Sequence, residues 1–161
     1  MAGIADWLSR MGVAASSSKL GGIFYYVVCR RIDSVLIPLT NGRLSMGPPG
    51  QTVLVTTRGA KSGKPRHASL AFLFEGDDMI LVASKGGSPA HPAWYHNMKA
   101  DPHVVVQHRG GIEERIAREA VGPERDRLFA RMAGTFANFA AYQERAVNRT
   151  IPVMVLSPTP R

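Results

Sequence analysis

Apolar and polar positions divide the chain into a helical beginning and a longer part with strand character. Within residues 4–31, apolar side chains recur at helical spacing, and Gly21-Gly22 separates this stretch into two helical pieces that end near Arg30-Arg31. Residues 38–50 are rich in Pro, Gly and Asn, which predicts a connector. From Gln51 onward, β-branched residues become frequent, and the pattern changes to that of strands.

Six segments of the second part have the apolar pattern of β-strands. Tight turns containing Gly separate several of them, and tight turns join antiparallel neighbours. The predicted strands are residues 51–57, 66–75, 79–84, a strand containing 104–106, 112–121 and 151–156. Pro92 predicts the start of a short helix over residues 92–99, and Pro123 the start of another, because Pro is favoured in the first helical turn.

These elements predict an α+β fold in which about six mainly antiparallel strands form a small β-barrel with flanking helices. We expect residues 1–50 to form an N-terminal helical segment and connector, and residues 51–161 to form the barrel. No internal repeat or low-complexity tract divides the chain, so the two parts are expected to make one structural domain.

The formal net charge of +8 and the isoelectric point near 10.3 predict an acidic partner. Nucleic acid, an anionic lipid surface and a multiply anionic small molecule are the alternatives, beside a basic surface that favours only solubility. The basic residues are scattered, and no zinc-finger, RRM or KH signature is present, so we expect no nucleic-acid partner.

The single cysteine, Cys29, excludes a disulfide within the chain and favours a reducing compartment. No secretory pattern opens the chain, so we expect a cytoplasmic protein. The longest apolar run, residues 23–29, is far shorter than the roughly 20 residues that a membrane-spanning helix needs. Residues 4–31 are expected to cap the barrel; peripheral contact with the inner face of the cell membrane is the alternative.

Two loops concentrate the candidate chemistry. Residues 57–66 and 83–97 follow apolar strand-like runs and are rich in Gly, Ser, Lys and Arg. Such loops offer backbone N–H groups and cationic side chains in one place, which suits an anionic ligand with a flat, stackable part.

Several common sites are absent from the sequence. It contains no Gly-x-Gly-x-x-Gly after a strand, no Walker A sequence and no Gly-x-Ser-x-Gly elbow. His91 and His96 are five residues apart, a spacing that does not place them on one helix face, so we expect no metal site. Loops with cations, hydroxyls and aromatics but no evident nucleophile or base suit a cofactor that performs the chemistry itself.

The two loops resemble the deazaflavin (coenzyme F-420)-dependent nitroreductase family of split-barrel flavin and deazaflavin oxidoreductases. The resemblance runs in the family's order from about Val53 to Val155. It is carried by residues 59–66 (Gly-Ala-Lys-Ser-Gly-Lys-Pro-Arg), 82–87 (Val-Ala-Ser-Lys-Gly-Gly), 92–97 (Pro-Ala-Trp-Tyr-His-Asn), 99–102 (Lys-Ala-Asp-Pro) and 149–152 (Arg-Thr-Ile-Pro).

The resemblance implies an FMN-binding split-barrel-like fold in which residues 51–161 hold F-420, with FMN as the alternative cofactor. The deazaflavin ring would lie against the strand end at residues 82–86. Lys61, Ser62 and Arg66 would contact the phosphate and the lactyl-oligoglutamate tail. The full set of implied cofactor contacts is Ala60, Lys61, Ser62, Arg66, Ser69, Leu70, Ala71, Val82, Ala83, Ser84, Lys85, Gly86, Ala93, Trp94 and Asn97.

In the alternative interpretation these residues bind no ligand. Lys61 and Arg66 are then ordinary solvated charges in a turn, and Ser84 and Lys85 only end a strand. Trp94 is equally placed to pack in the core.

The resemblance also implies a substrate side formed by Phe136, Phe139 and Tyr142, with Tyr142 as the catalytic residue that positions the acceptor or donates a proton. Members that reduce nitroimidazoles have Tyr at the position of Ala71 and three tyrosines where this chain has Phe136, Phe139 and Tyr142. An apolar mouth favours a quinone or an α,β-unsaturated lactone or enone over a nitroaromatic acceptor.

The alternative function is non-catalytic binding or carriage of F-420, FMN or haem. The oligomeric state is left open.

Overall fold

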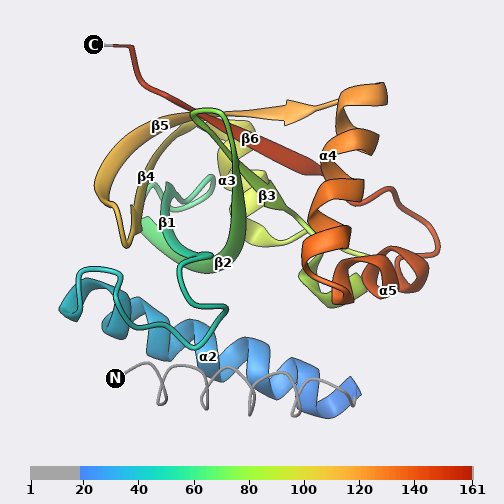
Figure 1. Ribbon diagram of the computed structural model, residues 1–161, viewed down its shortest axis with the longest axis horizontal. Helices are drawn as coiled ribbons and strands as arrows, with labels where there is room; N and C mark the ends of the chain where they lie inside the picture. Colours follow the sequence, from blue (N-terminus) through green and yellow to red (C-terminus); the bar gives the residue numbers. More distant parts are fainter. Residues whose placement is uncertain (1–18, 161) are drawn as a thin grey trace. The chain divides into compact units, whose positions relative to one another are not determined.

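The computed structural model describes residues 19–160, and side chains from residue 28 onward except that of residue 30. The strands close a barrel in the order β1-β2-β3-β6-β5-β4 (Figure 1). Their bounds are β1 Thr52–Arg58, β2 Pro65–Glu75, β3 Asp78–Val82, β4 His103–His108, β5 Gly111–Ala120 and β6 Val153–Pro158. The helices are α2 Lys19–Leu39, the 3-10 turn η1 Lys85–Gly87, α3 Ala93–Ala100, α4 Gly122–Thr135 and α5 Asn138–Arg145.

The predicted α+β barrel is confirmed. Pairing is antiparallel between β1 and β4, β2 and β3, β3 and β6, and β5 and β6. Each predicted strand is present, with boundaries shifted by at most two residues, which is the usual uncertainty at the ends of elements. The predicted helical piece within residues 4–18 lies outside the described residues.

The prediction for the second helical piece was wrong in its limits. Helix α2 continues through Gly21-Gly22 and past Arg31 to Leu39. Glycine in a helix interior costs only about 1 kcal/mol, which tertiary packing can offset. Buried Asp33 and Ile37 supply packing on one helix face beyond Arg31. The helix ends where Gly42, with a φ of 73°, donates its N–H to the Ile37 carbonyl at 2.9 Å.

The described chain divides into two compact units. Unit 1 consists of residues 19–56, 67–71 and 105–113, and it contains the buried Asp33 carboxylate. Asp33 accepts hydrogen bonds from the Ser69 hydroxyl at 2.6 Å and the Met46 N–H at 2.7 Å. Burial raises the pKa of Asp33, although both hydrogen bonds oppose that shift. This side chain therefore joins helix α2, the connector and strand β2 within unit 1.

Unit 2 consists of residues 57–66, 72–104 and 114–160, and its core lies around strands β3 and β6. Met79 and Leu81 of β3 and Met154 and Leu156 of β6 are almost fully buried. Helix α4 contacts both strands, and it contributes Leu128 and Met132 to this core. Each such side chain stabilises the fold by about 1.5–3 kcal/mol when fully buried.

Helix α5 lies against the turn that follows β3. Lys85, Gly86 and Gly87 have φ angles of 46°, 64° and 81°, so the chain reverses through the left-handed region. A Cβ atom at Gly87 would lie 2.7 Å from the Cβ of Arg145 and 2.8 Å from the carbonyl oxygen of Tyr142. The missing side chain of Gly87 is what allows α5, and with it Tyr142, to approach the end of β3.

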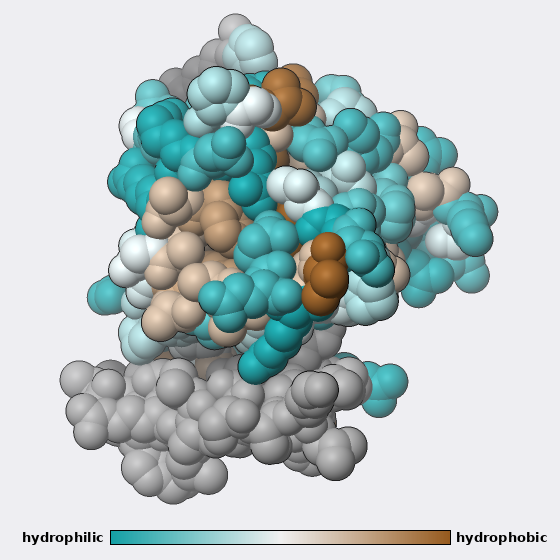
Figure 2. Space-filling model, turned by 90° about the vertical axis from the view of Figure 1, so that its right-hand side faces the viewer, coloured by the Kyte–Doolittle hydropathy of each residue, from teal (hydrophilic) through white to brown (hydrophobic). Residues whose placement is uncertain are grey.

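On the face shown in Figure 2, teal hydrophilic residues cover much of the surface, beside isolated dark brown residues and a tan, moderately apolar area at the left. Val35, Leu39 and Val147 are among the exposed large apolar side chains. Within residues 19–160, no helix has the length and apolar character needed to cross a membrane.

Replacing Gly87 by Ala should lower the free energy of unfolding by at least about 2 kcal/mol, because the new methyl group combines left-handed strain with overpacking. Gly86→Ala is the matched control, since its φ is similarly positive but no heavy atom lies within 4 Å of the added Cβ. That control should lose only about 1–2 kcal/mol. Urea unfolding monitored by circular dichroism measures both values, and equal losses would contradict the close packing of α5 on Gly87.

Candidate functional site

The loop between β1 and β2 is a tight turn that carries exposed cations. Gly63 donates its N–H to the Gly59 carbonyl at 2.7 Å, and Gly59 donates to the Lys64 carbonyl at 2.9 Å. Lys61 lies at the exposed tip of this turn. A Cβ at Gly59 would lie 2.6 Å from the Ser62 Oγ and 3.2 Å from the Lys64 carbonyl oxygen, so a side chain there would force Ser62 to move.

We call residues 59–66 the basic loop. Arg66 donates a hydrogen bond from its guanidinium to the Ser62 Oγ at 3.4 Å, and Lys61, Ser62 and Arg66 are all exposed. The loop contains no Asp or Glu. Cations gathered without acidic neighbours raise the local concentration of anions, so this loop is suited to a phosphate or carboxylate ligand.

Asn97 connects helix α3 to the basic loop. Its Oδ1 accepts the Ala60 N–H at 3.0 Å, and its Nδ2 donates to the Thr57 Oγ1 at 3.0 Å. Asn97 is 7% exposed and its neighbour Trp94 only 3%. Asn97 therefore holds the loop and the helix together, and both predicted contact residues present little surface to a ligand, whereas Ala93 is exposed.

We call residues 83–88 the strand-end turn. Val82, Ala83 and Ser84 are buried, and Lys85 and Gly86 are exposed. Ser84 has right-handed dihedrals (φ −73°, ψ −39°) and Lys85 a positive φ of 46°, a succession that forms anion-binding nests of backbone N–H groups. No heavy atom lies within 4 Å of a Cβ built on Gly86, so space is open beside this turn.

Arg149 holds the strand-end turn from inside, and sequence reasoning assigned no role to it. The guanidinium donates to the carbonyls of Ser84 at 2.7 Å, Ser88 at 2.8 Å and Ala83 at 3.3 Å. It also donates to His91 Nδ1 at 2.9 Å. Burial lowers the pKa of Arg149. The Arg-Thr-Ile-Pro segment was part of the family resemblance, and that was the one signal in the sequence that pointed to Arg149.

The contact with Arg149 determines the protonation state of His91. A guanidinium only donates hydrogen bonds, so His91 Nδ1 must accept, and the neutral ring carries its proton on Nε2. Burial, and then the positive charge of Arg149, lower the pKa of His91. The ring centroid of His91 lies 4.7 Å from that of Tyr95 and 5.9 Å from that of His96.

Three aromatic rings form a row from the end of α4 into α5. The ring centroids of Phe136 and Phe139 are 5.8 Å apart, and those of Phe139 and Tyr142 are 6.0 Å apart, in edge-to-face arrangements. Phe139 is 7% exposed, whereas Phe136 and Tyr142 are half-buried. Asn138 donates from its amide to the Tyr142 hydroxyl oxygen at 3.1 Å. The close approach at Gly87 brings this row to the strand-end turn.

The remaining predicted contacts, Ser69, Leu70 and Ala71, belong to unit 1. All three are half-buried, and the Ser69 hydroxyl donates to Asp33. The basic loop, the strand-end turn and the aromatic row all belong to unit 2.

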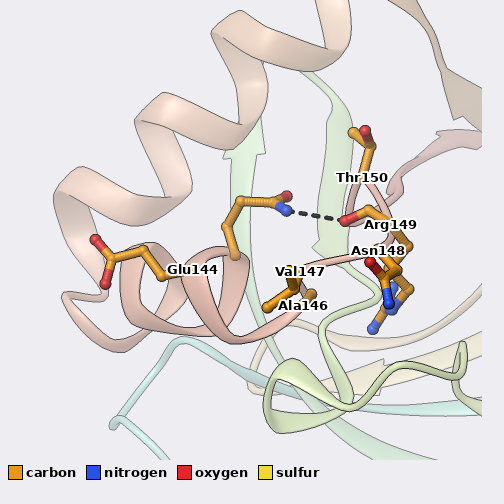
Figure 3. A pocket seen from close by; sticks show the side chains of 7 residues that line it. Glu144, Ala146, Val147, Asn148, Arg149 and Thr150 are labelled. Atoms are coloured by element: carbon orange, nitrogen blue, oxygen red, sulfur yellow. Dashed lines mark hydrogen bonds between the residues drawn. The ribbon is translucent and has the colours of Figure 1, made fainter.

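A polar hollow of about 680 Å³ lies at the end of α5 and along the segment that connects α5 to β6 (Figure 3). It is lined by residues 143–144 and 146–150. Gln143 Nε2 donates to the Arg149 carbonyl at 3.0 Å, drawn as the dashed line in Figure 3, and Gln143 Oε1 accepts from Arg125 and from the Ile151 N–H. The hollow contains none of the predicted site residues.

Comparisons with known proteins agree on one family. The sequence model of the F420H(2)-dependent quinone reductase family matches residues 31–158. An F420H(2)-dependent quinone reductase from Mycobacterium tuberculosis (strain ATCC 25618 / H37Rv) is 38% identical over 133 residues, which is 79% of this chain and 88% of that protein.

Solved structures give the same result. An F420-H2 dependent reductase (FDR-A) is 42% identical, with 66% of this chain and 94% of that chain covered and a TM-score of 0.61. A solved domain-swapped dimer is 37% identical, with 81% and 96% covered and a TM-score of 0.65. The architecture is therefore the split barrel of these reductases, and this chain belongs to the F420H(2)-dependent quinone reductase family.

Proposed function

We propose that this protein transfers a hydride from reduced coenzyme F-420 to an electron-poor planar acceptor, a quinone in the first place. The observation that carries the proposal is the 38% identity, over 79% of this chain, to a relative named as an F420H(2)-dependent quinone reductase. An α,β-unsaturated lactone or enone has the same flat, electron-poor character, and nitroaromatic compounds are the least favoured of these acceptors.

The donor set of unit 2 fits F-420. This cofactor combines a phosphate and several carboxylates with a flat ring, and it therefore needs cations at one end and a shaped, uncrowded surface at the other. The basic loop offers exposed Lys61, Ser62 and Arg66, and the loop itself contains no Asp or Glu. The strand-end turn offers successive right- and left-handed residues and open space beside Gly86.

In this proposal, residues 51–161 hold the cofactor, and the basic loop binds its anionic tail. Lys61 and Arg66 form charge-assisted hydrogen bonds to phosphate and carboxylate oxygens, and Ser62 adds a neutral donor. The backbone of Lys85 and Gly86 orients the polar edge of the ring. When bound, the reduced cofactor supplies the hydride, and the protein contributes binding, orientation and exclusion of water.

The aromatic row forms the acceptor side of the proposed site. Half-buried Phe136 offers its ring to a flat apolar molecule, and Phe139, which is only 7% exposed, packs edge-to-face against it from behind. The Tyr142 oxygen already accepts a hydrogen bond from Asn138, so the hydroxyl can use its own proton as the donor to an acceptor oxygen. Tyr142 is therefore proposed to hold the acceptor and to donate a proton as negative charge develops on the acceptor oxygen.

We further propose a cytoplasmic location, supported by the use of a single cysteine. A peripheral contact of residues 4–31 with the inner face of the cell membrane is a finer form of this proposal, supported by the lipid solubility of quinones. Vesicle co-sedimentation of the full chain, compared with a chain lacking residues 1–31, tests that contact.

A fluorescence titration of the purified protein with F-420, beside FMN, at low and high salt, tests the cofactor. Micromolar binding of F-420 that weakens with salt, with FMN much weaker, is the expected result. Preference for FMN or haem would move the protein to a flavin- or haem-binding role. Reduction of a soluble quinone by reduced F-420 then tests the reaction, and cofactor binding without any turnover would favour a carrier.

Changing Lys61 or Arg66 to Ala should raise the Kd for F-420 about tenfold or more, because a hydrogen bond to a charged group contributes about 1.5–3 kcal/mol. Both variants should also bind with a weaker dependence on salt. Arg131→Ala is the matched control: it removes a positive charge from α4, where Arg131 is paired with Glu75 at 2.9 Å. An equal loss in all three variants would show that net charge alone attracts the cofactor.

Changing Tyr142 to Phe should lower turnover with a quinone about a hundredfold, the smaller end of the usual contribution of a proton donor, while F-420 binding changes less than twofold. Steady-state kinetics with the acceptor varied, beside the fluorescence titration, separate the two effects. Tyr95→Phe is the control, since the Tyr95 hydroxyl donates to Glu119 and has no part in the proposed reaction. Unchanged turnover in Tyr142→Phe would remove Tyr142 from the mechanism.

A further inference from the structure

We propose that Arg149, together with neutral His91, is a positioning residue that sets the ligand-binding conformation of the strand-end turn and makes ligand affinity dependent on pH. The inference rests on the proposed function, because F-420 is the ligand in question. It assigns Arg149 and His91 a role through the turn and places neither of them in contact with the cofactor.

Arg149 determines the orientation of two peptide groups in the strand-end turn. Arg149 holds the carbonyl oxygens of Ala83 and Ser84, which belong to the peptide planes that carry the N–H groups of Ser84 and Lys85. In a planar trans peptide, the N–H points away from the carbonyl oxygen. Because the carbonyls face the guanidinium, the N–H groups of Ser84 and Lys85 are directed to the other side of the chain. Arg149 thereby sets the direction in which the turn presents its donors.

The strand-end turn contains a strained residue and needs contacts from other segments to keep its conformation. Lys85 is a non-glycine residue with a φ of 46°, a conformation that costs about 1–2 kcal/mol. Arg149 binds the chain on both sides of the strained residue, through Ser84 before it and Ser88 after it. The backbone of Tyr142 closes the turn at Gly87. Removing the guanidinium frees these carbonyls and lets the strain at Lys85 relax.

His91 can accept a hydrogen bond from Arg149 only when its ring is neutral. Protonation would place a second N–H donor and a second positive charge against the guanidinium at a 2.9 Å contact. Arg149 and His96 both disfavour the charged ring, while Glu119 favours it. The Glu119 carboxylate is already engaged by Tyr95 at 3.0 Å and Lys99 at 2.8 Å. Burial and Arg149 together keep the pKa of His91 below its ordinary value.

The sign of the pH effect follows from that lowered pKa. When the turn opens, His91 regains its ordinary pKa near 6.5, so the open state binds more protons than the closed state below that pH. The stability of the closed turn is complete above about pH 6.5 and is lost progressively as the pH falls through the window below it. The affinity for F-420 should therefore fall on acidification, and by more than protonation of the cofactor itself would cause.

Arg125 is a matched control, because it too serves backbone carbonyl groups in unit 2. It donates from Nε and NH2 to the Ile151 carbonyl at 3.0 and 2.8 Å and lies over the Phe129 ring at 4.3 Å. It binds no carbonyl of the strand-end turn. Arg149→Lys and Arg125→Lys therefore each remove a guanidinium fork and keep the charge, but only the first should affect the turn.

The test compares the wild type, Arg149→Lys and Arg125→Lys in two measurements. Without F-420, mass spectrometry follows the rate of tryptic cleavage after Lys85. We expect at least tenfold faster cleavage in Arg149→Lys than in either of the others. The Kd for F-420 should rise at least fivefold in Arg149→Lys and stay within twofold of the wild type in Arg125→Lys. Equal behaviour of the two variants in both measurements would overturn the positioning role.

His91→Asn tests the pH dependence, because an amide can accept from Arg149 and does not titrate in this range. Between pH 7.5 and 5.5, the wild type should lose F-420 affinity severalfold more than His91→Asn, and His91→Ala should bind weakly at both values. Identical pH profiles of the wild type and His91→Asn would overturn the role of His91.

The two proposals fail in different ways. Failure of the wild type to bind F-420 would overturn the proposed function and the ligand part of this inference, whereas cleavage after Lys85 still decides whether Arg149 holds the turn. Binding of F-420 by the wild type with an unchanged Kd in Arg149→Lys would leave the proposed function standing and overturn this inference.

Discussion

The guanidinium group of Arg149, which binds several backbone carbonyls, holds the conformation of the strand-end turn after β3. Arg149 binds the carbonyls of Ala83, Ser84 and Ser88 and the ring of His91, so its N–H groups donate to acceptors within the protein. A lysine has a single compact ammonium group and cannot serve acceptors in this fork geometry. The turn between β3 and α3 is thus held from inside by arginine and from α5 by the close contact at Gly87.

The distribution of charge explains why the basic loop suits an anion. Several cations elsewhere in unit 2 have carboxylate partners: Lys99 pairs with Glu119, Arg118 with Glu124, and Arg127 and Arg131 with Glu75. Exposed pairs of this kind contribute little to stability, but they cancel charge locally. The cations of the basic loop lie in a segment without acidic residues, so their positive charge is not cancelled within that segment.

The proposed site therefore combines two kinds of surface within unit 2. The basic loop and the strand-end turn supply polar groups on rigid backbone, and the row from Phe136 to Tyr142 supplies apolar ring edges with a single hydroxyl. In the proposal, anionic groups bind at the first surface and a flat apolar molecule binds at the second. Asn97 and Arg149 lie behind these surfaces, where each joins segments that are far apart in sequence. Their role is to keep the surfaces in place.

Local pattern was sufficient to predict the strands, the α+β barrel and the two Gly-, Ser- and Lys-rich loops, because strand alternation and turn residues act over a few neighbouring positions. The same reasoning failed for helix α2, which continues past Gly21-Gly22 and Arg31, since burial of Asp33 and Ile37 offsets poor local propensity. Only the tertiary structure revealed that Asn97 holds the basic loop from 37 residues away and that Arg149 holds the strand-end turn from 65 residues away. Composition and spacing determine which elements form, whereas a long-range hydrogen bond depends on where the closed barrel brings two distant segments together.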